Sequence, residues 1–250
     1  MLKKRIIPIL LLRGNSVVKT VRFDEVRMVG DAITNVKVFS TRKADEMVIV
    51  DIDATERGSI NFALLKRLSQ QCIMPLALGG GVKSLEDADE LFKVGADKVV
   101  VNSAFYDTPT LLTQISEKYG RQAVVFSLDV KRIDGEYRAV SHRSERVHEG
   151  VLVDIAKQAV EYGCGEIILN SVDHDGVMGG YDLDLCELVS EAVEVPVILA
   201  GGCGDKQDCV SAIQHQASAI AAGSIFYWVG ESIITIKEHM HDAGIEVRLL

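Results

Sequence analysis

The sequence lacks the features that would mark a secreted, metal-binding or membrane protein. Its cysteines form no CxxC pair and follow no His spacing typical of zinc ligands, so we expect buried thiols in a reducing cytoplasm and neither a metal nor another cofactor. These cysteines are Cys72, Cys164, Cys186, Cys203 and Cys209. No apolar run approaches the ~20 residues that a membrane-spanning helix needs. The apolar run near the N-terminus ends at Arg13 without a small-residue cleavage site, so a first core strand explains it better than a signal peptide.

Positive charge is also scarce. The chain has 27 Lys and Arg against 36 Asp and Glu, a formal net charge of −9 at pH 7. Nucleic acids and anionic membranes attract clustered Lys and Arg, so neither is expected as the main partner. An anionic ligand must instead be held locally by a few residues. With 48% hydrophobic residues, the 250-residue chain can bury a large core, and we expect one domain over residues 1–250.

The chain does contain a regular alternation of short apolar stretches and amphipathic ones. The apolar stretches predict eight strands, near residues 5–12, 47–52, 75–78, 98–102, 123–129, 166–170, 196–199 and 219–222. A helical period follows each, near residues 32–42, 61–71, 84–94, 110–118, 151–162, 183–192, 206–215 and 231–241. Eight such units predict an α/β fold, a (β/α)8 barrel. An open doubly wound sheet is the alternative, although "GGGV" lacks the spacing of a dinucleotide-binding motif.

The second half of the chain repeats the first. Residues 78–105 align with 200–226, and 44–53 with 164–173, at offsets of 120 to 122 residues. No linker rich in Pro or Ser separates the two halves. We therefore expect a barrel built from two repeated half-barrels that share one core.

The repeat duplicates a pattern that suits phosphate binding. Glycines ending at Gly81 follow strand 3 and Ser103 follows strand 4, while Gly202 follows strand 7 and Gly223 and Ser224 follow strand 8. Glycine lets backbone N–H groups approach an anion, serine adds a donor, and a helix N-terminus favours negative charge. Loops after strands 7 and 8 commonly bind phosphate in barrels. The duplication predicts a ligand with a phosphate at each end; tight turns alone are the alternative explanation.

Aspartates lie at or just beyond the C-terminal ends of three predicted strands, at the rim where barrel enzymes place their catalytic groups. They are Asp51, Asp129 and Asp175. Asp129 closes a run too apolar for an idle buried charge, so it is the candidate general acid or base. An Asp that only accepts backbone N–H bonds is the alternative, above all for Asp51. The repeat aligns Leu11 with Asp129, so the position for a matching second acid is apolar.

These residues resemble a known family. Over nearly its whole length the chain is similar to the cyclase subunit of imidazole glycerol phosphate synthase, in the stretches "KRIIP", "VVKTVRF", "GGGVKSLEDADEL", "GADKVVVN", "GYDLDL", "EVPVILAGGCG" and "AAGSIF". The resemblance implies a barrel that binds a long bisphosphate aminoimidazole carboxamide ribonucleotide. It also implies a glutaminase at the barrel bottom that sends ammonia up the core. Ammonia then drives cleavage and ring closure to imidazole glycerol phosphate and an aminoimidazole ribonucleotide.

The resemblance carries over to individual residues. Catalysis in the family depends on two aspartates at the ends of strands 1 and 5; the second matches Asp129 and the first falls on Leu11. Leucine cannot move a proton, and acid–base catalysis is typically worth ~10²–10⁴ in rate. Asn170 stands where the family more often has threonine. The resemblance implies that substrate and phosphate are held by Lys19, Asp51, Gly81, Asn102, Ser103, Asp175, Gly176, Gly202, Gly223 and Ser224.

Two further features follow from the resemblance. Lys19 lies on a long first loop, from Arg13 to Gly30, that we expect to close over the ligand. At the opposite end, four charged residues begin strands and match the family's ammonia gate: Arg5, Glu46, Lys98 and Glu166. Asp97 matches the docking face for the glutaminase. Without the resemblance, the loop lysine and the strand-start charges would be interpreted as ordinary solvated residues.

Three functions remain open. In the first, the chain is a paralogue of the type associated with glycosyl amidation, in which a glutaminase and this barrel deliver ammonia to a sugar amidotransferase for a surface polysaccharide; "LLL", "LNSVD" and "AAGS" resemble that subgroup. In the second, it is an active cyclase of histidine biosynthesis in which Asp51 or Asp53 compensates for Leu11. The third is a phosphate-binding module without a glutaminase, for which charge reversal at Asp97 or Lys98 has no effect.

Overall fold

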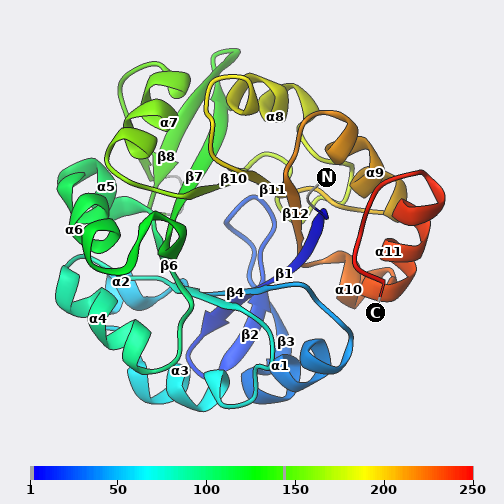
Figure 1. The fold of residues 1–250 in the computed structure, drawn as a ribbon, viewed down its shortest axis with the longest axis horizontal. Helices are drawn as coiled ribbons and strands as arrows, with labels where there is room; N and C mark the ends of the chain where they lie inside the picture. Colours follow the sequence, from blue (N-terminus) through cyan, green and yellow to red (C-terminus); the bar gives the residue numbers. More distant parts are fainter. Residues whose placement is uncertain (1–2, 143–144, 250) are drawn as a thin grey trace.

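A closed barrel of eight parallel strands forms the centre of the molecule (Figure 1). The computed structural model describes residues 3–142 and 145–249. The barrel strands are β1 (Arg5–Arg13), β4 (Met47–Asp51), β5 (Leu76–Gly79), β6 (Lys98–Val101), β7 (Val124–Ile133), β10 (Glu166–Ser171), β11 (Val197–Ala200) and β12 (Ala219–Ala222). Parallel pairing of β1 with β12 closes the barrel. The predicted (β/α)8 barrel is therefore confirmed.

Helices surround the barrel, because each presents one apolar stripe to the strands. They are α1 (Ala32–Thr41), α3 (Phe62–Ser69), α4 (Leu85–Lys93), α6 (Thr110–Tyr119), α7 (Leu152–Glu161), α8 (Leu183–Ser190), α9 (Lys206–Gln214) and α11 (Ile233–Asp242). One pair of equivalent helices in the two halves, α4 and α9, begins alike. A capping box of Ser84 and Asp87 starts α4, and one of Asp205 and Asp208 starts α9. This shared cap is a structural trace of the half-barrel repeat.

Two apolar layers hold the barrel together. The larger lies between strands and helices and includes Phe39, Leu65 and Leu112. The smaller fills the barrel itself with side chains that point inward, among them Ile7 and Val125. Strands buried on both faces need apolar residues at successive positions, which is why their sequences show no alternation. The inner layer forms an apolar column between the two ends of the barrel.

The carboxyl ends of the strands carry short additional elements. Three are single-turn helices, α2 (Ala54–Arg57), α5 (Ser103–Asp107) and α10 (Ile225–Trp228), and η1 (Arg121–Ala123) precedes β7 at the other end. Two antiparallel additions are β2 (Ser16–Lys19) with β3 (Arg27–Asp31), and β8 (Glu136–Ser141) with β9 (Arg146–Val147). Among the described residues, no helix is both long enough and apolar enough to cross a membrane.

The prediction of one long loop from Arg13 to Gly30 is wrong in part. Strand β1 continues beyond the barrel and pairs with β2, which pairs with β3. Val17 and Val18 drive this pairing, because both are β-branched and fully buried. Only residues 20–26 form a loop, and it lies over the barrel opening in Figure 1.

Candidate active site and charged ring

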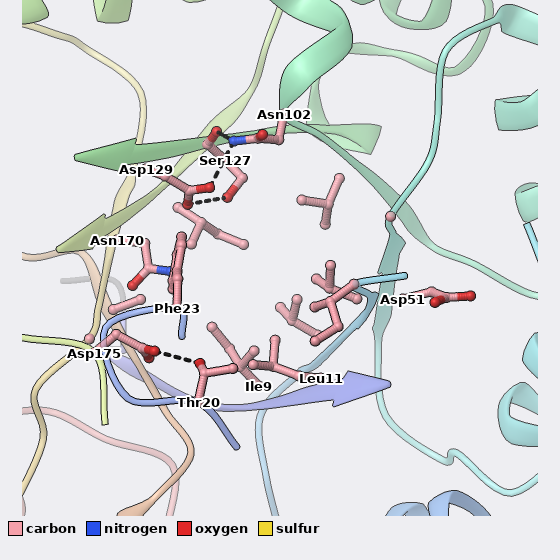
Figure 2. A pocket seen from close by; sticks show the side chains of 18 of the residues that line it. Ile9, Leu11, Thr20, Phe23, Asp51, Asn102, Ser127, Asp129, Asn170 and Asp175 are labelled. Atoms are coloured by element: carbon pink, nitrogen blue, oxygen red, sulfur yellow. Dashed lines mark hydrogen bonds between the residues drawn. The ribbon is translucent and has the colours of Figure 1, made fainter. Parts of the chain in front are cut away.

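A cavity of about 420 Å³ opens at the carboxyl ends of the barrel strands. Of the carboxylates predicted for acid–base roles, Asp129 and Asp51 line it and Asp53 does not. Its lining includes every residue predicted to bind substrate or phosphate, and also Leu11. The predicted residues that line the cavity are Lys19, Asp51, Gly81, Asn102, Ser103, Asp129, Asp175, Gly176, Gly202, Gly223 and Ser224. They come from loops as far as 205 positions apart in the sequence, and the barrel brings them to one site (Figure 2).

One wall of the cavity is apolar. Ile9 and Leu11 come from β1, and Val48 and Val50 from β4, with Leu11 opposite Val50 in the strand register. Figure 2 shows Leu11 and Ile9 on the side of the cavity that faces Asp129. The position aligned with the acid of β7 therefore contributes hydrocarbon to the site and no proton.

Asp51 does not replace the missing acid. Its Oδ2 accepts a hydrogen bond from Arg57 at 2.6 Å and its Oδ1 accepts one from the Asp53 backbone N–H at 3.2 Å. The side chain points away from Asp129 in Figure 2. Bonds from a guanidinium and a backbone N–H fix the orientation of this carboxylate. Asp51 therefore organises the first turn of the loop after β4.

The opposite wall is polar and centres on Asp129. Asn102 donates to Asp129 Oδ2 at 3.1 Å, and Ser127 donates to Oδ1 at 3.4 Å. Asn170 is the register partner of Asp129 on β10. Burial raises the pKa of Asp129 to about 7, while hydrogen bonds from Ser127, Asn170 and Asn102 act in the opposite direction. At neutral pH this carboxyl group can either accept or donate a proton.

Lys19 and Asp175 form a second polar group. Lys19 is only 5% exposed, and its Nζ donates to the Ile9 carbonyl oxygen at 2.6 Å. Burial lowers the pKa of Lys19 to about 8, opposed by the charge of Asp175. Thr20 donates to Asp175 Oδ2 at 2.6 Å, and burial raises the pKa of that carboxyl group. Lys19, expected on a loop that closes over the ligand, is the last residue of β2 and lies inside the cavity.

The glycine loops fit tightly around this group. A Cβ on Gly223 would lie 2.1 Å from Lys19 Nζ, so the amine occupies space that only glycine leaves open. A Cβ on Gly202 would lie 2.1 Å from the Gly180 carbonyl oxygen. Close packing accounts for these glycines by itself. The phosphate prediction therefore depends on the duplicated serines, which begin α5 and α10, and on the buried lysine.

The loop over residues 20–26 lies across the cavity in this structure. The Arg22 backbone N–H donates to the Asp175 carbonyl oxygen at 2.9 Å, and Arg22 Nε donates to the Asp173 carbonyl oxygen at 3.3 Å. Arg22 and Phe23 both have positive φ, 54° and 63°. Phe23 lines the cavity beside Asn170 (Figure 2). Sequence reasoning missed this contact, although "VVKTVRF" contains both residues.

The four charged strand-start residues form a closed ring at the other end of the barrel. Arg5 pairs with Glu46 at 2.6 Å and with Glu166 at 2.9 Å, and Lys98 pairs with the same two at 2.8 and 2.7 Å. Each cation thus contacts both anions. The Glu46 side chain is 3% exposed and that of Glu166 13%. The ring separates solvent from the apolar column.

Asp97 lies beside this ring and is exposed. Its Oδ2 accepts a hydrogen bond from the Leu76 backbone N–H, and its own N–H donates to the Leu76 carbonyl oxygen, both at 2.8 Å. Asp97 therefore clamps the starts of β5 and β6 together. The residue predicted for docking also has a structural contact that the sequence did not reveal.

The fold and these two sites define a (β/α)8 barrel with an acid-bearing cavity at one end and a closed ion-pair ring at the other. The family model described as histidine biosynthesis protein matches residues 5–230. The chain therefore belongs to the histidine biosynthesis protein family, as a HisF-like cyclase subunit of imidazole glycerol phosphate synthase.

Individual relatives agree with this membership. The imidazole glycerol phosphate synthase subunit HisF of Alkaliphilus metalliredigens is 40% identical over 252 residues, 99% of this chain and 100% of that one. The HisF subunit of Chlorobium luteolum is 39% identical over 251 residues, all of both chains. A Campylobacter jejuni protein, provisionally named imidazole glycerol phosphate synthase subunit hisF2, is 35% identical over 250 residues, all of both chains.

Proposed function

We propose that this barrel conducts ammonia from a glutaminase to a separate sugar amidotransferase, for amidation of a surface-polysaccharide sugar, and does not itself carry out the cyclase reaction. The observation that carries the proposal is the contrast between Leu11 and the ring. The ring has all four of its charges in contact, while the cavity has a hydrocarbon wall where the paired acid would be.

The chemistry of the cavity supports this proposal. Closure of the imidazole ring with ammonia in the cyclase reaction needs one group to accept protons and another to stabilise a cationic imine. Asp129 can do the first, because its pKa is raised to about 7. Leu11 can do neither, and Asp51 is held by Arg57 at 2.6 Å. A cavity whose wall opposite Asp129 is hydrocarbon suits ligand binding better than a reaction that needs an acid at both positions.

The interior of the barrel supports conduction. Ammonia is neutral, whereas an ammonium ion would lose its hydration among Ile7, Val48 and Val125. An apolar column therefore passes ammonia and excludes its protonated form. Passage requires the ring to open, since Arg5 and Lys98 each bridge both glutamates.

The ring end also has features of a docking surface. Asp97 is exposed, and its contact with Leu76 uses only one carboxylate oxygen. Ile73, in the loop just before β5, is 83% exposed. Ile73 comes three residues before Leu76, the residue that Asp97 contacts. An exposed apolar side chain and an exposed acidic one at the same end of the barrel suit a protein partner that offers an apolar pocket and a basic residue. In this proposal the partner is the glutaminase.

The cavity retains its anion-binding groups in this proposal. Ser103, Ser224 and Lys19 line it together with the glycine loops. A phosphate or bisphosphate ligand held there would report substrate supply to the glutaminase. The barrel would then act as an allosteric subunit as well as a conduit.

A second candidate is an active cyclase of histidine biosynthesis. It is favoured by the 39% and 40% identity to two proteins named HisF, and by Asp129, whose pKa of about 7 suits a general acid or base. This candidate requires another group to do the work of an acid at position 11.

Turnover with ammonia alone distinguishes the two candidates. Purified barrel is given an ammonium salt and the bisphosphate ribonucleotide, and imidazole glycerol phosphate is measured for the unchanged protein, Leu11→Asp and the uncharged control Leu11→Asn. The proposal predicts no product from the unchanged protein or Leu11→Asn, and product from Leu11→Asp. Product from the unchanged protein would refute it in favour of the cyclase.

A further inference from the structure

Two hydrogen bonds join the strand starts directly beside the charged ring. The Ile6 backbone N–H donates to Asp45 Oδ2 at 2.9 Å, and the Asp45 N–H donates to the Ile6 carbonyl oxygen at 3.4 Å. Ile6 follows Arg5 and Asp45 precedes Glu46 in the chain. The clamp therefore fixes the two backbone positions that carry the 2.6 Å Arg5–Glu46 pair.

The same clamp occurs beside Lys98, where Asp97 and Leu76 make the two equivalent bonds. The two aspartates differ in their second contact. Lys237 on α11 donates to Asp45 Oδ1 at 2.6 Å and to the Lys43 carbonyl oxygen at 2.8 Å. The side chains of Lys237 and Asp45 are 3% and 9% exposed. The Asp45 carboxylate is thus largely removed from solvent and is paired with the Lys237 ammonium group, whereas Asp97 is exposed.

The charge of Lys237 affects the charged ring because Asp45, which it neutralises, lies beside Glu46 in the chain. A buried carboxylate without a counter-charge strongly attracts the nearest available cation. Arg5 lies one residue from Ile6, the clamp partner of Asp45, and its guanidinium has five N–H donors. Without Lys237, an uncompensated negative charge would lie at the backbone positions that carry Arg5 and Glu46 and would disturb how they hold the Arg5–Glu46 pair.

We infer that Lys237, with Asp45, is a positioning element of the charged ring, in which the lysine neutralises Asp45 and so leaves the Arg5–Glu46 pair undisturbed. The importance of this element for ammonia conduction rests on the proposed function. The ring and the contacts of Asp45 and Lys237 are observed in the structure and do not depend on that proposal. The outer helix α11 thereby controls how firmly the ring is closed.

The test follows the ring side chains of the isolated barrel by NMR. In 15N-labelled protein, the rate at which the Arg5 guanidinium protons exchange with water reports how often the ring opens. Lys237→Met is expected to speed this exchange about tenfold, the effect of a modest loss of ion-pair free energy. The double variant Asp45→Asn/Lys237→Met removes both charges and is expected to restore the original rate.

Two single variants serve as controls. Lys4→Met removes a lysine at the same end of the barrel, whose Nζ donates to the Ala217 carbonyl oxygen at 2.9 Å, and is expected to leave Arg5 exchange unchanged. Lys237→Arg retains the charge and is expected to keep exchange slow. If Lys237→Met does not fold but the double variant folds with the original exchange rate, the uncompensated carboxylate is the cause and the inference stands.

Two results would overturn the inference. Equal acceleration in the single and double variants would mean that Lys237 acts only by packing, and no acceleration in either would mean that the ring is independent of it. A glutaminase complex adds a functional readout, in which Lys237→Met is expected to release more glutamine-derived ammonia into solution. Failure of the barrel to bind any glutaminase, with the expected exchange pattern, would refute the proposed function alone.

Discussion

The two ends of the barrel differ in how much of their chemistry is present. At the ring end, Arg5, Glu46, Lys98 and Glu166 make four ion pairs of 2.6 to 2.9 Å. At the cavity end, Asp129 faces the hydrocarbon of Leu11. Both ends are built from the same strands, so a general loosening of the fold would affect both. The proposed function accounts for this difference, because a barrel that conducts ammonia without cyclase chemistry needs the ring and does not need a second acid.

The two ends also differ in which groups compensate for the burial of charged side chains. In the ring, each charge has two opposite charges, and together the four residues are neutral. In the cavity, Asp129 accepts hydrogen bonds from neutral groups, including Asn102 and Ser127 at 3.1 and 3.4 Å. Opposite charges therefore compensate for burial in the ring, whereas burial in the cavity raises the pKa of Asp129. The predictions below test this contrast, beginning with the largest expected effect.

Breaking the ring at its most buried member is expected to be the most damaging change. Glu46→Gln leaves Arg5 and Lys98 with Glu166 alone, and removing one partner from a buried pair typically costs ~3–5 kcal/mol. Urea unfolding measures the loss. Glu90→Gln is the matched control, since its pair with Lys93 is exposed on α4 and is expected to change stability by less than about 1 kcal/mol. Similar losses in both variants would contradict a special role for the ring.

The cavity end is expected to show a pH dependence that Asp129 dominates. Its pKa is raised from 3.8 to about 7, so the folded protein binds more protons than the unfolded chain in that interval. The contribution of Asp129 therefore becomes less favourable as pH rises from about 4 to about 7, by up to ~4 kcal/mol.

Asp129→Asn should remove this dependence. The measurement is the difference in unfolding free energy between the unchanged protein and the variant at several pH values. The account expects the variant to gain stability relative to the unchanged protein between pH 4 and 7, with no further gain well above pH 7. A constant difference would mean that Asp129 has an ordinary pKa.

Closure of the loop over the cavity is expected to depend on Gly176. Its φ is 68°, and a Cβ there would lie 2.0 Å from the Thr20 carbonyl oxygen. Gly176→Ala is therefore expected to displace residues 20–26 and to cost ~1–3 kcal/mol. Gly14→Ala is a close control, because its φ is 58° and a Cβ there would meet nothing within 4 Å.

Binding of inorganic phosphate or a bisphosphate, measured by calorimetry, should weaken in Gly176→Ala and not in Gly14→Ala. The reason is that displacement of Thr20 also moves Lys19 in the cavity. Equal affinities in the two variants would separate loop closure from anion binding.

The smallest effect on stability is expected at Asp97, where the cost of Asp97→Asn is about 1 kcal/mol, because asparagine can still accept from the Leu76 N–H. Its effect on association with the glutaminase should be larger, since the substitution removes the exposed charge. Comparing unfolding with glutaminase affinity separates the clamp from docking. Unchanged affinity would favour a barrel that acts without this partner.

Much of this organisation could be predicted from local sequence. Continuous apolar runs identified the eight strands, and the duplicated Gly–Ser pattern pointed to four loops that meet at the cavity. The hairpin of β2 and β3 was missed, because Val17 and Val18 are too short a run to distinguish from a loop. The structure shows which of the predicted site residues line the cavity. Their roles in phosphate binding, and the role of Asp97 in docking, remain predictions.

Contacts between distant residues could not be predicted. Lys237 meets Asp45 across 192 positions, and nothing in the local pattern of α11 marks one lysine as buried. The pairing of Asp51 with Arg57 is local, but the sequence does not reveal which way the carboxylate points. Both contacts depend on packing that only the folded barrel fixes.

The most direct test of the difference between the two ends combines both in one reaction. The barrel is mixed with a glutaminase subunit, glutamine and the bisphosphate ribonucleotide, and glutamine hydrolysis and imidazole glycerol phosphate are measured together. The account predicts that the barrel stimulates hydrolysis while no imidazole product forms. Imidazole product appearing in step with glutamine consumption would contradict it and identify a working cyclase.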